Sequence, residues 1–190
     1  MILEGLVTTI DKSGQLHLAP MGPDVEPGFR RFELRPFPSS QTYQNLCESG
    51  EGVLHVTDDV LLLARAAIGR IETTPPHRTA EKVRGFVLSG ACRAYEFEVR
   101  DIDRSQERVR MSCEVVHSVV LRDFFGFNRA KHAVVEAAIL ATRIHLLPIE
   151  QIRTEFERLH VLVRKTGGPP EHEAFDILKD YVESASKEKA

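Results

Sequence analysis

The stretch FFGFNRAKHAVVEAAILATRIHLLP, residues 124–148, is where the character of this chain changes. Between Ala130 and His145 it contains no turn-forming residue and is rich in Ala, Leu, Ile and Glu, a composition typical of a helix. Apolar side chains cover so much of its circumference that we expect the helix to be largely buried, in the core or against another chain. This stretch therefore predicts a helix over 130–145.

Helical patterns continue after it. Pro148 opens a second predicted helix, and its apolar stripe consists of Ile149, Ile152, Phe156, Leu159 and Val163. Glycines and prolines at 167–170 separate a third predicted helix over 173–187.

The residues before the stretch read mainly as β-strands. LEGLVTTI (3–10) and QLHLAPMG (15–22) flank the turn DKSG and predict a hairpin. Further strands are expected at 29–37, 52–59, 85–101 and 107–121, the last two with period-2 patterning and one buried face. Short helices are expected up to Gly50 and over 60–69, with Asp58 or Asp59 as the N-cap of the second. About six strands before about sixty helical residues predict a mainly β fold, a barrel or sandwich, with a helical C-terminal third.

Composition narrows the class of protein. The 190 residues are 42% hydrophobic, carry a formal charge of −3, and hold no apolar run long enough to span a membrane. This balance gives no reason to expect nucleic acid or an anionic membrane as a partner. Three cysteines without metal-ligand spacing, and no basic region before the first apolar run, predict a cytoplasmic protein with reduced, buried thiols.

The segment RPFPSSQTYQNL, residues 35–46, is the strongest candidate site. Arg35 can give two parallel hydrogen bonds to a phosphate, and hydroxyl and amide groups follow it on Ser39, Ser40, Thr42 and Asn45. A helix that begins here would aim its free N–H groups at the same point. The alternative is that Ser40 or Thr42 caps the helix and Arg35 is solvated.

Other constellations are weaker. His132 and Glu136 share a helix face, but an ordinary helical pair is favoured over a metal site because no third ligand is spaced to join them. His17, His55 and His117 lie among apolar strand residues, where satisfied core or surface histidines are the default. No catalytic residue can be assigned, so an organic cofactor would carry the chemistry of any enzyme activity.

Three segments in order carry a family resemblance: GLVTTIDKSGQLHLAPMG (5–22), RPFPSSQTYQNL, and GEGVLHVTDDVLLLARAAIG (50–69). Together they resemble the FMN-binding split-barrel superfamily, which includes flavin reductases and pyridoxamine-phosphate oxidases. FGFNRAKHAVVEAAILATRIHLL is similar to a functionally unassigned archaeal and bacterial family of such flavoproteins with a helical C-terminal extension. The similarity in pattern runs to about residue 165.

The resemblance implies a split β-barrel over residues 1–127 and a helical extension over 128–190, packed on the barrel and on a dimer partner. It implies a homodimer with FMN at or near the interface. It places Arg35, Ser39, Ser40, Thr42 and Asn45 in the phosphate loop, and lines the isoalloxazine with Thr8, Thr9 and the segment Ala19, Pro20, Met21 and Gly22.

The sequence also departs from the better-known relatives. It shows no basic pyridoxal-phosphate-binding cluster near the C-terminus, which argues against a pyridoxamine-phosphate oxidase. Asn128 begins the helix after FFGF, where capping is favoured over ligand contact.

Two classes of function stay open. One is an FMN-dependent oxidoreductase, resembling flavin reductases, that takes hydride from a reduced nicotinamide or deazaflavin. The other is a non-catalytic FMN carrier, sensor or pathway-assembly subunit. A donor site is expected, if anywhere, in the loop TTPPHRTAEK (73–82), where His77, Arg78 and Lys82 could meet an anionic co-substrate. A solvated loop with scattered charge is the alternative interpretation.

Overall fold

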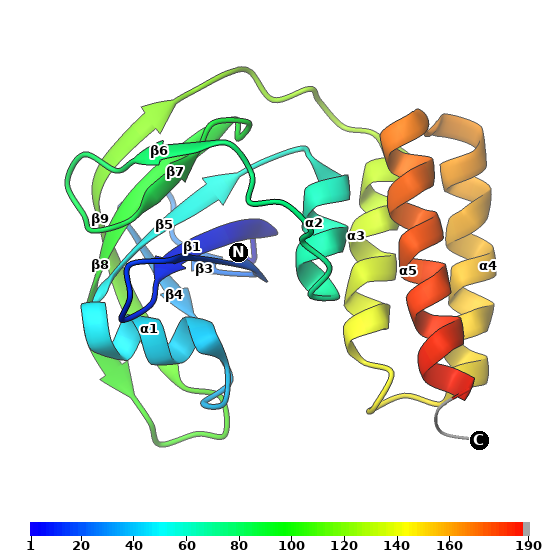
Figure 1. The fold of residues 1–190 in the computed structure, drawn as a ribbon, viewed down its shortest axis with the longest axis horizontal. Helices are drawn as coiled ribbons and strands as arrows, with labels where there is room; N and C mark the ends of the chain where they lie inside the picture. The colour runs from blue at the N-terminus through cyan, green and yellow to red at the C-terminus, as the bar shows by residue number, and fades with distance from the viewer. Residues whose placement is uncertain (188–190) are drawn as a thin grey trace. The chain divides into compact units, whose positions relative to one another are not determined.

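The computed structural model describes residues 1–187, and the chain divides into two compact units. The first unit holds Met1–Thr57 and Pro75–Phe124, and the second holds residues 58–74 together with those from Phe125 onward. Figure 1 shows the strands in the first and α2 to α5 in the second. The chain thus enters the helical unit briefly, between two strands, before it returns there for the C-terminal third.

The first unit is built on one curled antiparallel sheet of seven strands. Their order is β2-β1-β5-β8-β9-β4-β3, and their bounds are β1 Gly5–Ile10, β2 Leu16–Met21, β3 Asp24–Val25, β4 Arg31–Leu34, β5 Glu51–Val56, β8 Arg93–Asp103 and β9 Arg110–Val120. Main-chain bonds from Leu3 N to Pro23 O (3.0 Å) and from Val25 N to Met1 O (2.9 Å) join β3 to the residues that lead into β1. A helix, α1 (Gln41–Ser49), and a separate hairpin, β6 (His77–Thr79) with β7 (Phe86–Leu88), complete the unit.

The predicted N-terminal hairpin is confirmed, with Gly5 opposite Met21 and Ile10 opposite Leu16. Its turn forms because Asp11 Oδ1 accepts hydrogen bonds from Ser13 N (2.8 Å) and Gln15 N (2.9 Å). Pro20 lies within β2 and costs no ladder bond there, since β2 is the last strand on its side of the sheet.

The inner face of the curled sheet holds an aromatic core. Phe32 packs edge-on against Phe97 with ring centroids 5.1 Å apart, and Phe29 stacks on Tyr95 at 4.0 Å. Gly52 is required beside this core, because a Cβ at that position would lie 2.7 Å from Cζ of Phe97. The alternation of Tyr95, Phe97 and Val99 along β8 thus places side chains in the core, as the period-2 pattern predicts.

Three features of the strands differ from expectation. β3 forms in the proline segment after Met21, where no strand was expected. The loop expected over 73–82 contains β6. The long strand expected over 85–101 is interrupted: β7 turns away through residues 89–92, where Ala91 N bonds Leu88 O at 3.3 Å, and pairs with β6 instead of continuing into β8.

The second unit is four helices: α2 (Val60–Ala67), α3 (Arg129–Thr142), α4 (Ile149–Thr166) and α5 (Pro169–Lys187). α3 contacts the other three, and its small buried side chains permit close approach; these are Ala130, Ala133, Val134, Ala137, Ala138 and Ala141. Of the two burials expected for α3, the core of its own unit is therefore the one observed. The predicted boundary between 127 and 128 stays a prediction, and α2 packs with the C-terminal helices although β8 and β9 of the sheet lie between them in the sequence.

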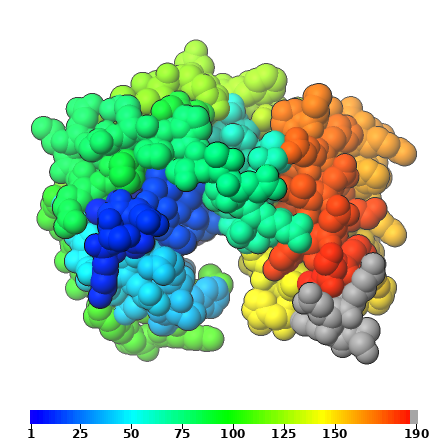
Figure 2. All heavy atoms as spheres, viewed as in Figure 1, coloured from blue at the N-terminus to red at the C-terminus, as the bar shows by residue number. Residues whose placement is uncertain are grey.

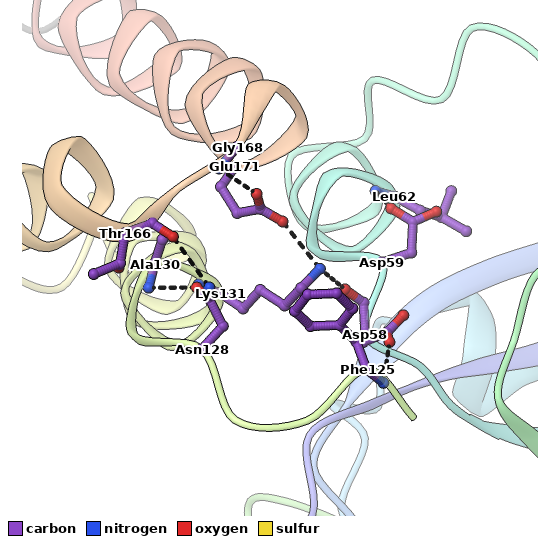
Figure 3. A network of polar contacts seen from close by, with 10 residues as sticks. All are labelled: Asp58, Asp59, Leu62, Phe125, Asn128, Ala130, Lys131, Thr166, Gly168 and Glu171. Atoms are coloured by element: carbon purple, nitrogen blue, oxygen red, sulfur yellow. Dashed lines mark hydrogen bonds and ion pairs between the residues drawn. The ribbon is translucent and has the colours of Figure 1, made fainter. Parts of the chain in front are cut away.

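Polar contacts tie together the ends of these helices (Figure 3). Asn128 caps α3, as predicted, by accepting hydrogen bonds from Ala130 N (2.8 Å) and Lys131 N (3.1 Å). Lys131 Nζ donates to Asp58 O (2.7 Å) and pairs with Glu171 Oε1 (2.9 Å). Asp58 Oδ2 accepts from Phe125 N at 2.7 Å. The two points at which the chain passes into the helical unit, at 58 and at 125, are thereby joined to each other.

Candidate functional site

The segment 35–46 folds into a turn followed by α1. Ser40 is the N-cap: its Oγ accepts from Tyr43 N (3.2 Å) and donates to Phe37 O (2.8 Å). The capping alternative for Ser40 is therefore correct. The cap satisfies only the N–H of Tyr43, so the N–H groups of Gln41 and Thr42 lack an acceptor within the helix, as in any first turn. Ser39 is exposed beside them.

Thr42 and Asn45 lie on the buried side of α1. Asn45 Nδ2 donates to Thr9 Oγ1 on β1 (2.9 Å), and Asn45 Oδ1 accepts from Gln41 Nε2 (2.7 Å). The Asn45 amide is thus engaged within the chain and fixes α1 on the sheet. Consistent with this, α1 packs against β1 and β2, and Figure 2 shows the surfaces of α1 and the N-terminal hairpin side by side.

Arg35 is paired with acidic groups and is not simply solvated. Its Nε donates to Glu33 Oε1 (2.6 Å), and its Nη2 lies 3.9 Å from Asp24 Oδ2. The side chain is 44% exposed. Because these ion pairs are accessible to water, they stabilise the fold little, and a stronger anion could replace them.

Arg35 also lines an open groove of about 550 Å³ on β3, β4, β8 and β9. Its wall carries three arginines, Arg31, Arg35 and Arg100, and four carboxylates, Asp24, Glu26, Glu33 and Glu114. Val25, Phe32 and Cys113 lie between them. Of the residues predicted to hold FMN, only Arg35 lines the groove; the N-terminal part of its lining begins at Asp24, two residues after Gly22. Its volume falls in the range of ligand pockets.

The residues predicted to line the flavin ring differ in accessibility. Thr8 and Thr9 are fully buried and point to opposite faces of β1: Thr8 Oγ1 donates to Phe86 O (2.6 Å), and Thr9 meets Asn45. Their side chains are therefore used inside the chain. Pro20 and Met21 are half-buried at the sheet edge, and Gly22 is exposed.

His77, Arg78 and Lys82, the possible co-substrate residues, lie together on the β6–β7 hairpin and are exposed. His77 Nδ1 is 2.8 Å from Pro75 O, and its ring meets Phe86 edge-on. Arg78 Nη1 is 3.7 Å from Glu81 Oε1. The hairpin thus gives this cationic group a defined backbone, which the expectation of a loop did not predict.

Two buried polar residues, Glu96 and His55, hold the backbone of the β6–β7 hairpin, a role that the sequence did not reveal. Glu96 is completely buried, and its carboxylate accepts from the backbone N–H groups of residues 81–83. His55 is also fully buried; its Nε2 accepts from Leu88 N (3.0 Å), so Nδ1, 3.2 Å from Leu6 O, carries the proton. Burial lowers the pKa of His55 to about 4. His55 is therefore the satisfied core histidine that its sequence context predicts. The sequence feature that could have indicated a buried role for Glu96 is its position within an otherwise apolar strand.

Potential metal ligands and thiols are dispersed over the fold. Within residues 1–187, no group of three or more His, Cys, Asp or Glu is placed to hold a metal ion. Cys92 and Cys113 are buried as expected, whereas Cys47 is exposed, contrary to expectation, since it lies on the outer side of α1. Burial raises the pKa of the Cys113 thiol to about 12. No helix among the described residues has the length and apolarity needed to cross a membrane.

Family models match both parts of the sequence. The N-terminal domain model of a family described as protein of unknown function, DUF447, matches residues 3–122. The C-terminal model of the same family matches residues 128–180. The chain belongs to the DUF447 family.

Several solved structures share the fold of this chain. The FMN-bound DUF447 protein MM1853 from Methanosarcina mazei superposes with a TM-score of 0.82 at 22% identity, over 95% of this chain and 94% of that one. Flavoredoxin of Desulfovibrio vulgaris superposes with a TM-score of 0.54 at 13% identity, over 63% of this chain and 69% of the flavoredoxin chain. The styrene monooxygenase flavin reductase of Pseudomonas putida S12 superposes with a TM-score of 0.52 at 14% identity, over 62% of this chain and 78% of that one. The curled sheet with its C-terminal helices is thus a split barrel with a helical extension, as predicted.

Proposed function

We propose that this DUF447 protein binds FMN, with the phosphate at the first turn of α1. The observation that carries the proposal is local: a helix of nine residues begins with an exposed serine, a capping serine and two first-turn N–H groups, six residues after an accessible arginine. Such a group of donors suits a phosphate monoester. A protein with the same fold over nearly the whole chain, MM1853, is FMN-bound, and this supports the choice of ligand.

The roles of the predicted residues divide accordingly. Ser39 and the α1 amides would bind the phosphate directly, together with Arg35 once its guanidinium exchanges Glu33 for the anion. Thr42, Asn45 and Thr9 would act indirectly, because their buried side chains hold α1 on β1. The edge residues Pro20, Met21 and Gly22 would offer backbone groups to the ring system, beside the groove that starts at Asp24. FMN, when bound, would supply redox chemistry that none of these side chains can supply.

The phosphate contact can be tested by comparing FMN with riboflavin, which lacks the phosphate. Charge-assisted hydrogen bonds to the phosphate should make FMN bind more tightly by roughly tenfold or more at low salt, and the advantage should shrink as salt rises. Isothermal titration calorimetry with both flavins measures this difference. Equal affinities would show that the start of α1 does not hold the phosphate.

For the use of the flavin, we favour an oxidoreductase that accepts hydride from a reduced nicotinamide or deazaflavin. Hydride transfer to a flavin needs no protein acid or base, and two structural neighbours are a flavin reductase and a flavoredoxin. The alternative is a carrier, sensor or assembly subunit. Anaerobic stopped-flow mixing with each donor separates them: faster bleaching of bound than of free FMN supports the enzyme, and no acceleration by any donor supports the carrier.

We also propose a homodimer, and the observation that supports it is a group of exposed phenylalanines, not the apolar surface of α3. α3, whose apolar surface suggested an interface, is covered by α2, α4 and α5. The phenylalanines before it are not covered: Phe125 is 74% and Phe127 is 94% exposed. Adjacent exposed aromatics of this kind favour an interaction surface. Light scattering should return twice the chain mass of 21.4 kDa, and a stable monomer at low concentration would refute the dimer.

A further inference from the structure

The β6–β7 hairpin is attached to the barrel in an unusual way. Among the described strands, β6 and β7 pair only with each other, in a two-stranded sheet with His77 opposite Leu88 and Thr79 opposite Phe86. The hairpin lies over β1 and β5 (Figure 1), with no β-ladder to either. Its backbone must therefore find its other hydrogen-bond partners among side chains.

Four side chains from three strands of the barrel supply those partners. The Glu96 carboxylate on β8 accepts from Glu81 N (2.9 Å), Lys82 N (2.6 Å) and Val83 N (3.3 Å). On β5, Glu51 accepts from Arg84 N (2.8 Å) and His55 from Leu88 N (3.0 Å). On β1, Thr8 donates to Phe86 O (2.6 Å). Six main-chain groups of the hairpin are thus held by side chains, and Glu96 alone holds three.

The anchoring side chains form part of one polar row across the sheet. Thr8 is opposite Val53, Val53 is opposite Glu96, and Glu96 is opposite His117, so these four residues share one face of β1, β5, β8 and β9. His55 and Glu51 lie two residues from Val53 and therefore on that same face. The hairpin also covers an apolar cluster whose buried members are Val53, Val83, Val87 and Ala94, separate from the aromatic core on the other face of the sheet. Opening would therefore hydrate the polar row and this cluster and leave the aromatic core intact.

The last residue of the row favours opening. His117 Nε2 is buried without a hydrogen-bond partner, although Glu81 Oε2 of the hairpin lies 3.5 Å away. Water would satisfy this nitrogen as soon as the hairpin lifted. The closed position is thus stabilised by Glu96 and opposed by His117.

We propose that residues 77–88 form a strap that opens and closes on the barrel as one unit, with the Glu96 carboxylate as its main anchor. The strap carries His77, Arg78 and Lys82, so opening moves all three at once. The proposal is independent of FMN, because every contact it uses lies within the chain.

Hydrogen exchange on the full-length protein without flavin tests the strap. The amides of Lys82, Val83 and Leu88 should exchange through an opening at least about tenfold more frequent than the opening that exposes the ladder amides of β1, β5 and β8. Glu96→Gln replaces an acceptor oxygen by a donor group and should accelerate exchange over residues 80–88 a further tenfold or so, with the barrel unchanged. His117→Leu removes the unsatisfied nitrogen and should slow it.

Glu98→Gln is the matched control, because Glu98 is on the same strand but pairs with Arg100 and does not contact the strap. It should leave exchange over residues 80–88 unaltered. If Glu96→Gln fails to fold, Glu51→Gln tests a single anchor at the exposed edge. Strap and barrel amides that exchange at equal rates in the wild type, or that respond equally to these variants, would overturn the proposal.

Discussion

Asn45 on α1 donates from Nδ2 to Thr9 Oγ1 on β1 over 2.9 Å, and both side chains are buried. Thr9 belongs to the strand predicted to line the flavin ring, and Asn45 to the segment predicted to cradle its phosphate. The hydrogen bond therefore fixes the two halves of the proposed site relative to each other, although neither side chain reaches the surface. Sequence reasoning assigned both to direct contact with FMN, and the structure favours an indirect role.

Asn45→Ala should destabilise the protein by about 1–3 kcal/mol, because it leaves Thr9 Oγ1 buried without its donor. Urea unfolding followed by circular dichroism measures the change. Gln44→Ala is the control, since Gln44 is exposed on the same helix, and it should change the free energy of unfolding by less than about 0.5 kcal/mol. If both substitutions lowered the free energy of unfolding equally, the hydrogen bond from Asn45 to Thr9 would not be a specific source of stability.

Arg35 and Glu33 should have opposite effects on FMN affinity. Arg35→Ala removes a charge-assisted contact and should weaken binding by about 1.5–3 kcal/mol, or roughly 10- to 150-fold in Kd. Glu33→Gln frees the guanidinium from its 2.6 Å ion pair and removes a nearby negative charge, so it should tighten binding. Flavin fluorescence titration reads both. Arg30→Ala is the matched control, because Arg30 is an exposed arginine outside the groove lining. If Arg30→Ala weakened FMN binding as much as Arg35→Ala, the effect would come from the loss of positive charge and not from a specific contact of Arg35.

His55 should make stability depend on pH. Burial lowers its pKa to about 4 from the ordinary 6.5, so between these values the unfolded chain binds a proton that the folded chain does not. The stabilisation is complete above pH 6.5 and is lost as pH falls, by about 3 kcal/mol at pH 4. Denaturant titrations at half-unit pH steps should show this slope. The slope should become much shallower in His55→Gln, with the remainder due to groups such as His17, whose pKa burial also lowers. It should persist in His160→Gln, an exposed control; an unchanged slope in His55→Gln would assign it to other groups.

α2 should depend on the C-terminal helices. Its side chains Val60, Leu63 and Ala64 are buried, and it packs against α3 and α5. A fragment of residues 1–127 keeps α2 but loses both partners, so we expect it to aggregate or to melt well below the full chain. Differential scanning fluorimetry with light scattering follows both. A soluble fragment with the melting temperature of the full chain would show that α2 needs neither.

Features encoded within a few residues were predictable. A run rich in β-branched residues identifies β1, alternating apolar side chains identify β2, β8 and β9, and the caps Ser40, Asp59 and Asn128 mark where three helices begin. Gly50 ends α1 in the left-handed conformation that favours glycine. Each signal needs only local chemistry, and the structure confirms each.

Features that depend on distant partners were not predictable. β3 and β6 have two and three residues, too few for a periodic pattern, and exist because β4 and β7 pair with them. Glu96 reads as an exposed strand residue until residues 81–83 cover it. Arg35 reads as a free phosphate ligand because the sequence does not show its pairing with Glu33. For the proposed site, the sequence indicated the segment, and the structure adds which of its side chains are exposed and which are buried.

FMN binding is the property on which the proposed function depends. The most direct measurement is a titration of FMN with purified protein, followed by quenching of flavin fluorescence and by the visible absorption shift. We predict saturable binding of one FMN per chain, with a Kd below about 10 µM, or near −7 kcal/mol. No saturable change with protein at several tens of micromolar, roughly −6 kcal/mol, would contradict the account.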